Sequence, residues 1–184
     1  MKKDLTISFV KANLVGLLML VPAALFGALY FSLWGWRFVP EHPILSLNPV
    51  AAVLYLVIIV IGMFVHELIH LASAMYFGKI SSRDFKFGIE PKTLSPYFHC
   101  KVPLEVGVYR KLTAMPGFIL GLLPSLIGLI SGNPWIMLFG LIFCLGAGGD
   151  MLILWLLRNV KQGTMVEDHP SRVGCFIIET DDAA

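Results

Sequence analysis

The stretch that decides the fold runs from residue 48 to residue 78 and reads NPVAAVLYLVIIVIGMFVHELIHLASAMYFG. A helix that crosses the hydrocarbon layer of a bilayer needs about 20 predominantly apolar residues. No charged residue occurs between 48 and 65, and the apolar pattern continues to residue 78. We predict a membrane-spanning helix here, since an α-helix satisfies all its backbone hydrogen bonds within one segment. The acidic and basic residues inside it are His66, Glu67 and His70.

The composition of the whole chain agrees with a membrane protein. Its 184 residues are 57% hydrophobic and 14% charged, whereas a soluble domain has about 25% charged residues. The formal net charge is only +2, and the basic residues lie beside apolar stretches, which excludes nucleic acid as a partner. The three cysteines are odd in number and lack a framework spacing, so we expect reduced thiols and no disulfide scaffold. We expect one membrane-embedded domain over residues 1–184.

Charged residues divide the apolar sequence into four predicted helices. These cover residues 12–36, 48–78, 112–131 and 134–157, with a loop at 79–111 and a tail at 158–184. The third contains Pro116 and Pro124, which predict a kink, and neighbouring groups can satisfy the freed carbonyls. We therefore predict an all-α membrane protein with about four transmembrane helices.

The predicted loop between the second and third helices contains the signature of a small β-hairpin. Phe85, Phe87 and Ile89 alternate with more polar residues, and a second extended run follows at 97–104 after a proline-containing turn. Its edge could receive an extended peptide, and an ordinary loop is the alternative. In the tail, residues 173–178 are typical of a short strand or an interfacial segment.

The distribution of Lys and Arg predicts the orientation. Three basic residues precede the first predicted helix, seven lie in the loop at 79–111 and three follow the fourth helix, whereas the opposite side offers only Arg37. Cytoplasmic loops carry the excess of basic residues, so we expect both termini and the hairpin in the cytosol and the protein in the plasma membrane. The first apolar run is longer than the core of a signal peptide, so we expect a retained helix.

The motif that carries chemistry is His66-Glu67-Leu68-Ile69-His70, which matches H-E-x-x-H on a helix. Positions i and i+4 differ by about 40° around the helix, so the two imidazoles share a face and can bind one divalent cation. Glu67 lies beside them, where it could hold a metal-bound water. The alternative is a set of residues that form hydrogen bonds between helices, but this leaves the cost of burying Glu67 unexplained.

Asp150 is the candidate for a third metal ligand. A catalytic zinc site uses three protein ligands and one open position. His70 lies nine residues before Lys79 and Asp150 lies eight before Arg158, so both are about 12 Å from the cytosolic ends of their helices. Small residues next to these positions would allow close helix approach: Gly62, Ala74, Gly146, Ala147, Gly148 and Gly149. The alternative is that Asp150 pairs with an arginine or a backbone amide.

The sequences VHELIH, GAGGDMLILWLL and DHPSRVGC together resemble the small zincin peptidase family of integral membrane metalloproteases, which is similar in plan to the site-2 protease clan. The resemblance spans most of the chain from the second predicted helix onward. It implies His66 and His70 as zinc ligands, Glu67 as the catalytic base and Asp150 as the third ligand. The clan commonly has an Asn-Pro element and a following Gly around the aspartate, and GAGGDM has neither.

We therefore predict a zinc-dependent intramembrane metallopeptidase that hydrolyses peptide bonds of membrane or membrane-proximal substrates, with Zn²⁺ as cofactor and Glu67 activating a zinc-bound water. The alternatives are a catalytically silent metal-binding protein that acts through a protein partner and a small divalent-cation carrier. A carrier would normally repeat its polar sites along a path. Three other histidines are weaker candidates: His169 could fold back to the site, His99 is a minor ligand candidate, and His42 should be remote.

Overall fold

The computed structural model describes residues 2–7, 14, 16–35, 49–89, 96–169 and 173–178. Its principal helical segments are η1 (Leu17–Met19), α2 (Leu20–Trp34), α3 (Pro49–Gly78), α4 (Val106–Pro116), η3 (Gly117–Leu122), α5 (Leu123–Ser131), α6 (Pro134–Gly146) and α7 (Gly148–Leu157). A short 3-10 turn, η2 (Ser82–Asp84), leads into the first hairpin strand. The strands are β1 (Lys2–Ile7), β2 (Phe85–Ile89), β3 (Pro96–Cys100), β4 (Leu104–Glu105), β5 (Met165–Asp168) and β6 (Val173–Ile178).

Three of the described helical stretches are long and apolar enough to cross a membrane. They are Leu17–Trp34, Pro49–Gly78 and Val106–Ser131, and the bent pair α6 and α7 passes the same test when taken together. The predicted helix at 48–78 is confirmed almost to the residue. In α3 most of the apolar side chains are exposed, and Leu56 is 62% exposed. Such an exposed apolar surface is typical of a helix that lies against lipid or against another protein.

The third predicted helix begins earlier than expected, at Val106 and not at residue 112. The Glu105 carboxylate explains the difference, because it accepts hydrogen bonds from the backbone N–H groups of Gly107 and Val108 and caps the helix. The helix continues through the π-helical segment η3, between Pro116 and the proline of α5. The basic residues at 110 and 111 therefore lie in a helix and not in the loop.

The fourth predicted helix, 134–157, is broken. α6 ends at Gly146, α7 begins at Gly148, and the two axes differ by 47°. The break falls in the Gly-Ala-Gly-Gly run, whose glycines lower helix propensity by about 1 kcal/mol each. A Cβ atom added at Gly146 or Gly149 would contact nothing within 4 Å, so these glycines do not serve the close helix approach that the sequence predicted for them.

The chain is not all-α, because strands from its two ends and β4 from its middle form a four-stranded sheet with the order β1-β6-β5-β4. Of the two alternatives predicted for residues 173–178, the strand is the one observed, whereas β1, β4 and β5 were not predicted. The register between β1 and β6 pairs Lys2 with Ile178, which lie near opposite ends of the chain. No local pattern predicts such a pairing. The hairpin in the central loop is confirmed: β2 and β3 pair antiparallel as a separate two-stranded sheet, with Phe85 opposite Cys100.

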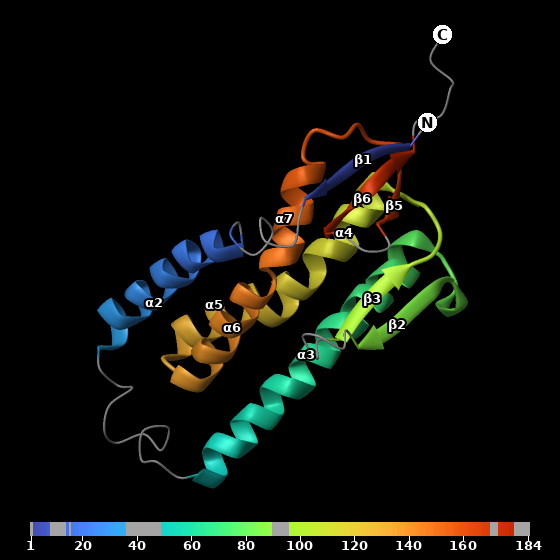
Figure 1. The fold of residues 1–184 in the computed structure, drawn as a ribbon. Helices are drawn as coiled ribbons and strands as arrows, with labels where there is room; N and C mark the ends of the chain where they lie inside the picture. Colours follow the sequence, from blue (N-terminus) through green and yellow to red (C-terminus); the bar gives the residue numbers. More distant parts are fainter. Residues whose placement is uncertain are drawn as a thin grey trace.

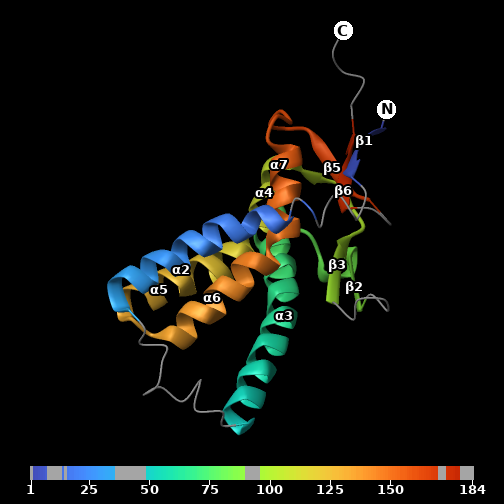
Figure 2. The same ribbon diagram turned by 60° about the vertical axis from the view of Figure 1, so that its left-hand side comes forward.

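The two sheets gather at one end of the helices, as Figures 1 and 2 show. There α3, α4 and α7 meet the strands, and a buried cluster forms that includes Ala74, Val106, Leu112, Leu157 and Val166. At the other end, the N-terminal half of α3 contacts α6 through Tyr55, whose ring packs against Trp135 with 4.9 Å between centroids. The best-packed part of the molecule therefore surrounds the C-terminal halves of α3 and α7.

Candidate metal centre

The H-E-x-x-H residues lie in the C-terminal half of α3, beside the buried cluster. The imidazole rings of His66 and His70 have their centroids 5.0 Å apart. One ligand atom from each of His66, Glu67 and His70 lies within 4.8 Å of the others. This is the spacing expected one helical turn apart, so the three side chains face a common point.

Asp150 reaches this point from the first turn of α7. One carboxylate oxygen, Oδ2, lies 3.1 Å from Nε2 of His66, and the other, Oδ1, lies 3.4 Å from Nε2 of His70. All three side chains are largely buried, at 10–15% exposure. The bend before α7 therefore brings the carboxylate between the two imidazoles, and the structure brings together the three residues that the sequence singled out.

A backbone carbonyl orients His70, and sequence reasoning missed it. Nδ1 of His70 lies 2.9 Å from the carbonyl oxygen of Leu112 in α4, and this nitrogen must donate because a carbonyl only accepts. In an α-helix the Leu112 carbonyl would accept from the N–H of residue 116, which is Pro116 and has none. The proline thus leaves an acceptor for the histidine. The signal was present in the sequence as a proline four residues after Leu112.

This arrangement fits a bound divalent metal ion. With Nδ1 protonated, a neutral His70 presents the lone pair of Nε2 toward Asp150. Oδ2 of Asp150 is buried, and within the described residues it faces the Nε2 atom of His66 but makes no hydrogen bond to any other group. A buried carboxylate is costly unless it is paired or binds a metal. Two imidazole nitrogens and a carboxylate oxygen form a common ligand set for catalytic zinc. The hydrogen bond to His70 is the kind of outer contact that orients such ligands.

Asp168 of the DHP sequence holds the surrounding elements together. It accepts hydrogen bonds from the Tyr109 hydroxyl of α4 and from the backbone N–H of Cys100 in β3, the latter at 2.8 Å. Burial raises the pKa of its carboxyl, while these two hydrogen bonds act in the opposite direction. Asp168 therefore joins the hairpin, the larger sheet and α4.

The other candidate histidines are not part of this cluster. His169 packs its ring against Phe176, with 4.8 Å between centroids, and so lies against β6. His99 has its Nδ1 3.7 Å from Oδ2 of Asp168. The cluster found among the described residues contains neither of them. His42 lies outside the residues that the structure describes.

The cysteines of the two sheets are unsuited to bind a metal as thiolates. Cys100 and Cys175 are buried, free thiols. Burial raises the pKa of Cys100 to about 11 and that of Cys175 to about 12. A metal ligand must be a thiolate, so these residues belong to the core.

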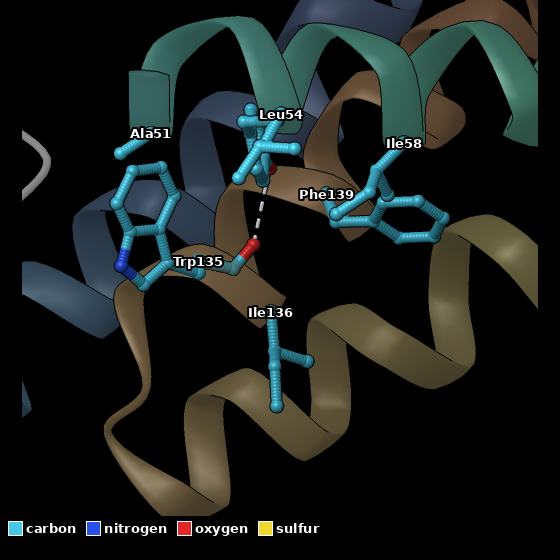
Figure 3. A pocket seen from close by; sticks show the side chains of 7 residues that line it. Ala51, Leu54, Ile58, Trp135, Ile136 and Phe139 are labelled. Carbon is cyan, nitrogen blue, oxygen red and sulfur yellow. Dashed lines mark hydrogen bonds between the residues drawn. The ribbon is translucent and has the colours of Figure 1, made fainter. Parts of the chain in front are cut away.

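An apolar cavity of about 420 Å³ lies between the N-terminal parts of α3 and α6 (Figure 3). Its polar side-chain groups are the indole N–H of Trp135 and the Tyr55 hydroxyl, and the hydroxyl donates to the Trp135 carbonyl oxygen at 3.1 Å. Ile58, the lining residue of α3 nearest in sequence to His66, is eight residues away, about 12 Å along the helix. The cavity therefore contains no group for hydrolytic chemistry and is separate from the histidine cluster.

Comparison with known families agrees with the geometry. The model of a family described as "Putative zincin peptidase" matches residues 56–165, which is more than half of the chain. The match includes His66, Glu67, His70 and Asp150. The protein belongs to this family. No curated protein and no solved structure gave a significant match.

Proposed function

We propose that the protein is a zinc-dependent integral membrane metallopeptidase, similar in plan to the site-2 protease clan. The observation that carries this proposal is the convergence of two imidazole Nε2 atoms and a buried Asp150 carboxylate whose Oδ2 makes no hydrogen bond to any other group within the described residues. Family membership supports the same class of chemistry. His66, His70 and Asp150 would hold the ion, and Glu67 would be the catalytic base.

Each residue of the cluster has a distinct task in hydrolysis. When bound, zinc polarises the scissile carbonyl and lowers the pKa of water. Glu67 adjoins His66 on α3, where it takes the proton from the attacking water and later delivers it to the leaving amine. The Leu112 carbonyl holds the His70 ring in one tautomer and one orientation. Burial of the cluster keeps the electrostatic interactions strong.

The substrate proposed is a membrane protein or peptide cleaved in or near the bilayer. Exposed apolar side chains along α2 and α3 support membrane embedding. The basic residues lie mainly at the end of the helices that holds both sheets, so this end and both termini would face the cytosol. The cluster is then about 12 Å deep. Water and an unwound peptide would reach it from the cytosolic side, beside the β2–β3 hairpin.

The test is a Glu67→Gln variant of the full chain, expressed beside the wild type and a Glu167→Gln control. Glu167 lies in β5 and pairs with Lys2, away from the cluster. Zinc content is measured on the purified proteins, and new peptide termini are compared in membranes from the three expressing strains. We expect Glu67→Gln to keep zinc and to lose the new termini, whereas Glu167→Gln retains both.

Other outcomes would favour the two rival functions. New termini that persist in Glu67→Gln would remove this residue from catalysis. Bound zinc without any wild-type cleavage would favour a catalytically silent metal-binding protein. Metal flux into liposomes that depends on His66 and His70 would favour a cation carrier.

A further inference from the structure

A second cavity, of about 620 Å³, lies where the four-stranded sheet meets the end of α7. β1, β6 and α7 lie close together there (Figure 1). The lining combines basic, polar and apolar side chains from strands and helix: Lys3, Leu5, Trp155, Leu156, Arg158, Asn159, Val160, Lys161, Thr164 and Ile177. It is distinct from the histidine cluster, since neither His66 nor His70 lines it.

The charge around this cavity has one sign. Lys3, Arg158 and Lys161 line it, and no acidic side chain does. Lys2, the neighbour of Lys3, points to the opposite face of β1 and pairs with Glu167 at 2.7 Å. No ion pair joins the three lining cations to an acid within the described part of the chain. Three exposed cations at one concavity favour an anionic ligand.

The backbone at the end of α7 is prepared for an anion. The C-terminal carbonyls of a helix carry partial negative charge. Here Arg110 of α4 donates through Nη2 to the Leu157 carbonyl and, at 2.7 Å, to the Val160 carbonyl. Arg158 donates to the Trp155 carbonyl at 2.7 Å. Three carbonyls at this end, those of Trp155, Leu157 and Val160, are therefore already paired with guanidinium groups, which lessens their repulsion of an anion.

The apolar side of the cavity continues along α7. The Arg158 guanidinium stacks on the Trp155 ring, 3.9 Å from its centroid, which fixes its direction at the end of the apolar helix. Trp155 is 56% exposed and Met151, one turn earlier, is 40% exposed. A ligand with an anionic head and apolar chains would match both surfaces, whereas a free anion would contact only the basic one.

We propose that this cavity binds the headgroup of an anionic phospholipid, with the phosphate between Lys3, Arg158 and Lys161 and an acyl chain along Trp155 and Met151. The site lies at the end of the span formed by α6 and α7, which is headgroup depth if that pair crosses the bilayer. The lipid would tie β1 and the sheet to the membrane surface. The proposal is independent of metal binding and of hydrolysis.

The experiment counts bound lipid on the full-length protein by native mass spectrometry. Delipidated protein is titrated with phosphatidylglycerol or phosphatidylcholine. The test variant combines Lys3→Gln, Arg158→Gln and Lys161→Gln, and its single members keep the test valid if the triple variant does not fold. The control variant replaces three exposed cations between the end of α3 and β2, with the same change in net charge: Lys79→Gln, Arg83→Gln and Lys86→Gln.

We expect one phosphatidylglycerol to bind in preference to phosphatidylcholine. Each lost cation should weaken binding about fivefold, and the triple variant about a hundredfold. The control should stay within about twofold of the wild type. Equal binding of the two lipids, or equal losses in test and control variants, would overturn the proposal. Displacement of the lipid by millimolar inorganic phosphate would assign the site to free phosphate and overturn the lipid assignment.

Discussion

Replacing Asp150 by Asn should have opposite effects on the metal-free and the zinc-bound protein. In the metal-free protein, the buried Asp150 carboxylate faces the Nε2 atoms of His66 and His70 at 3.1 and 3.4 Å, and a buried charge that faces neutral imidazoles costs several kcal/mol. Asn removes that charge at nearly the same volume. The metal-free variant should therefore unfold at a temperature equal to or above that of the metal-free wild type.

The zinc-bound protein should lose stability. Changes in outer contacts weaken metal binding about 10–100-fold, so loss of a direct ligand should reach at least the upper value. Zinc at a thousand times its Kd stabilises the native state by about 4.1 kcal/mol, and a hundredfold weaker Kd leaves about 1.4 kcal/mol. The lost stabilisation of about 2.7 kcal/mol corresponds to about 5–10 °C in Tm for a chain of this size.

The assay is thermal unfolding of detergent-solubilised protein, followed by tryptophan fluorescence with and without zinc. Asp168→Asn is the matched control, because it also removes a buried carboxylate but one that accepts two hydrogen bonds. It should lower the free energy of unfolding by about 1–3 kcal/mol, and so lower Tm by the same amount with and without zinc. If Asp150→Asn behaved in this way, Asp150 would be a structural partner of the histidines and the reasoning would be refuted.

Three further predictions concern single positions. Pro116→Ala restores a helical N–H that competes with His70 for its carbonyl acceptor, so zinc affinity measured by chelator competition should fall about 10–100-fold. Pro124→Ala, the control, should leave it unchanged. The Gly163 N–H, with two further backbone N–H groups, holds the pKa of Glu105 below its ordinary value of 4.5. The ionised Glu105 carboxylate therefore stabilises the folded protein fully above pH 4.5, and this contribution is lost as the pH falls through the lowered pKa. Thermal unfolding of the wild type and Glu105→Gln is measured at a series of acidic pH values, and the difference in Tm should shrink as the pH falls. A difference that stays constant would contradict this. Burial raises the pKa of Cys175 to about 12, so maleimide at pH 8 should label it only in denaturant. Rapid labelling of the native protein would show that the thiol is exposed.

Much of the metal centre was predictable because its parts follow from local rules. The i, i+4 spacing of His66 and His70 on an uninterrupted apolar helix places both imidazoles on one face. Counting residues to the next charge predicted the depth of Asp150 in the membrane. Its carboxylate oxygens lie 3.1 Å from Nε2 of His66 and 3.4 Å from Nε2 of His70. Its role as a metal ligand remains a prediction. The hairpin was also predictable, because β2 and β3 are close in sequence.

The sequence by itself determined which segments are apolar helices and which turn of α3 carries the histidines, because both depend on periodicity and transfer of side chains from water. Tertiary structure alone decided that Lys2 pairs with Ile178, that the helix breaks at Ala147 and that the Leu112 carbonyl receives His70. Each of these depends on which distant group satisfies a backbone hydrogen bond or fills the space beside a glycine. Such choices minimise the energy of the whole packed molecule, so the glycine run and Pro116 mark positions where a helix is weak, and only the packed structure decides what happens there.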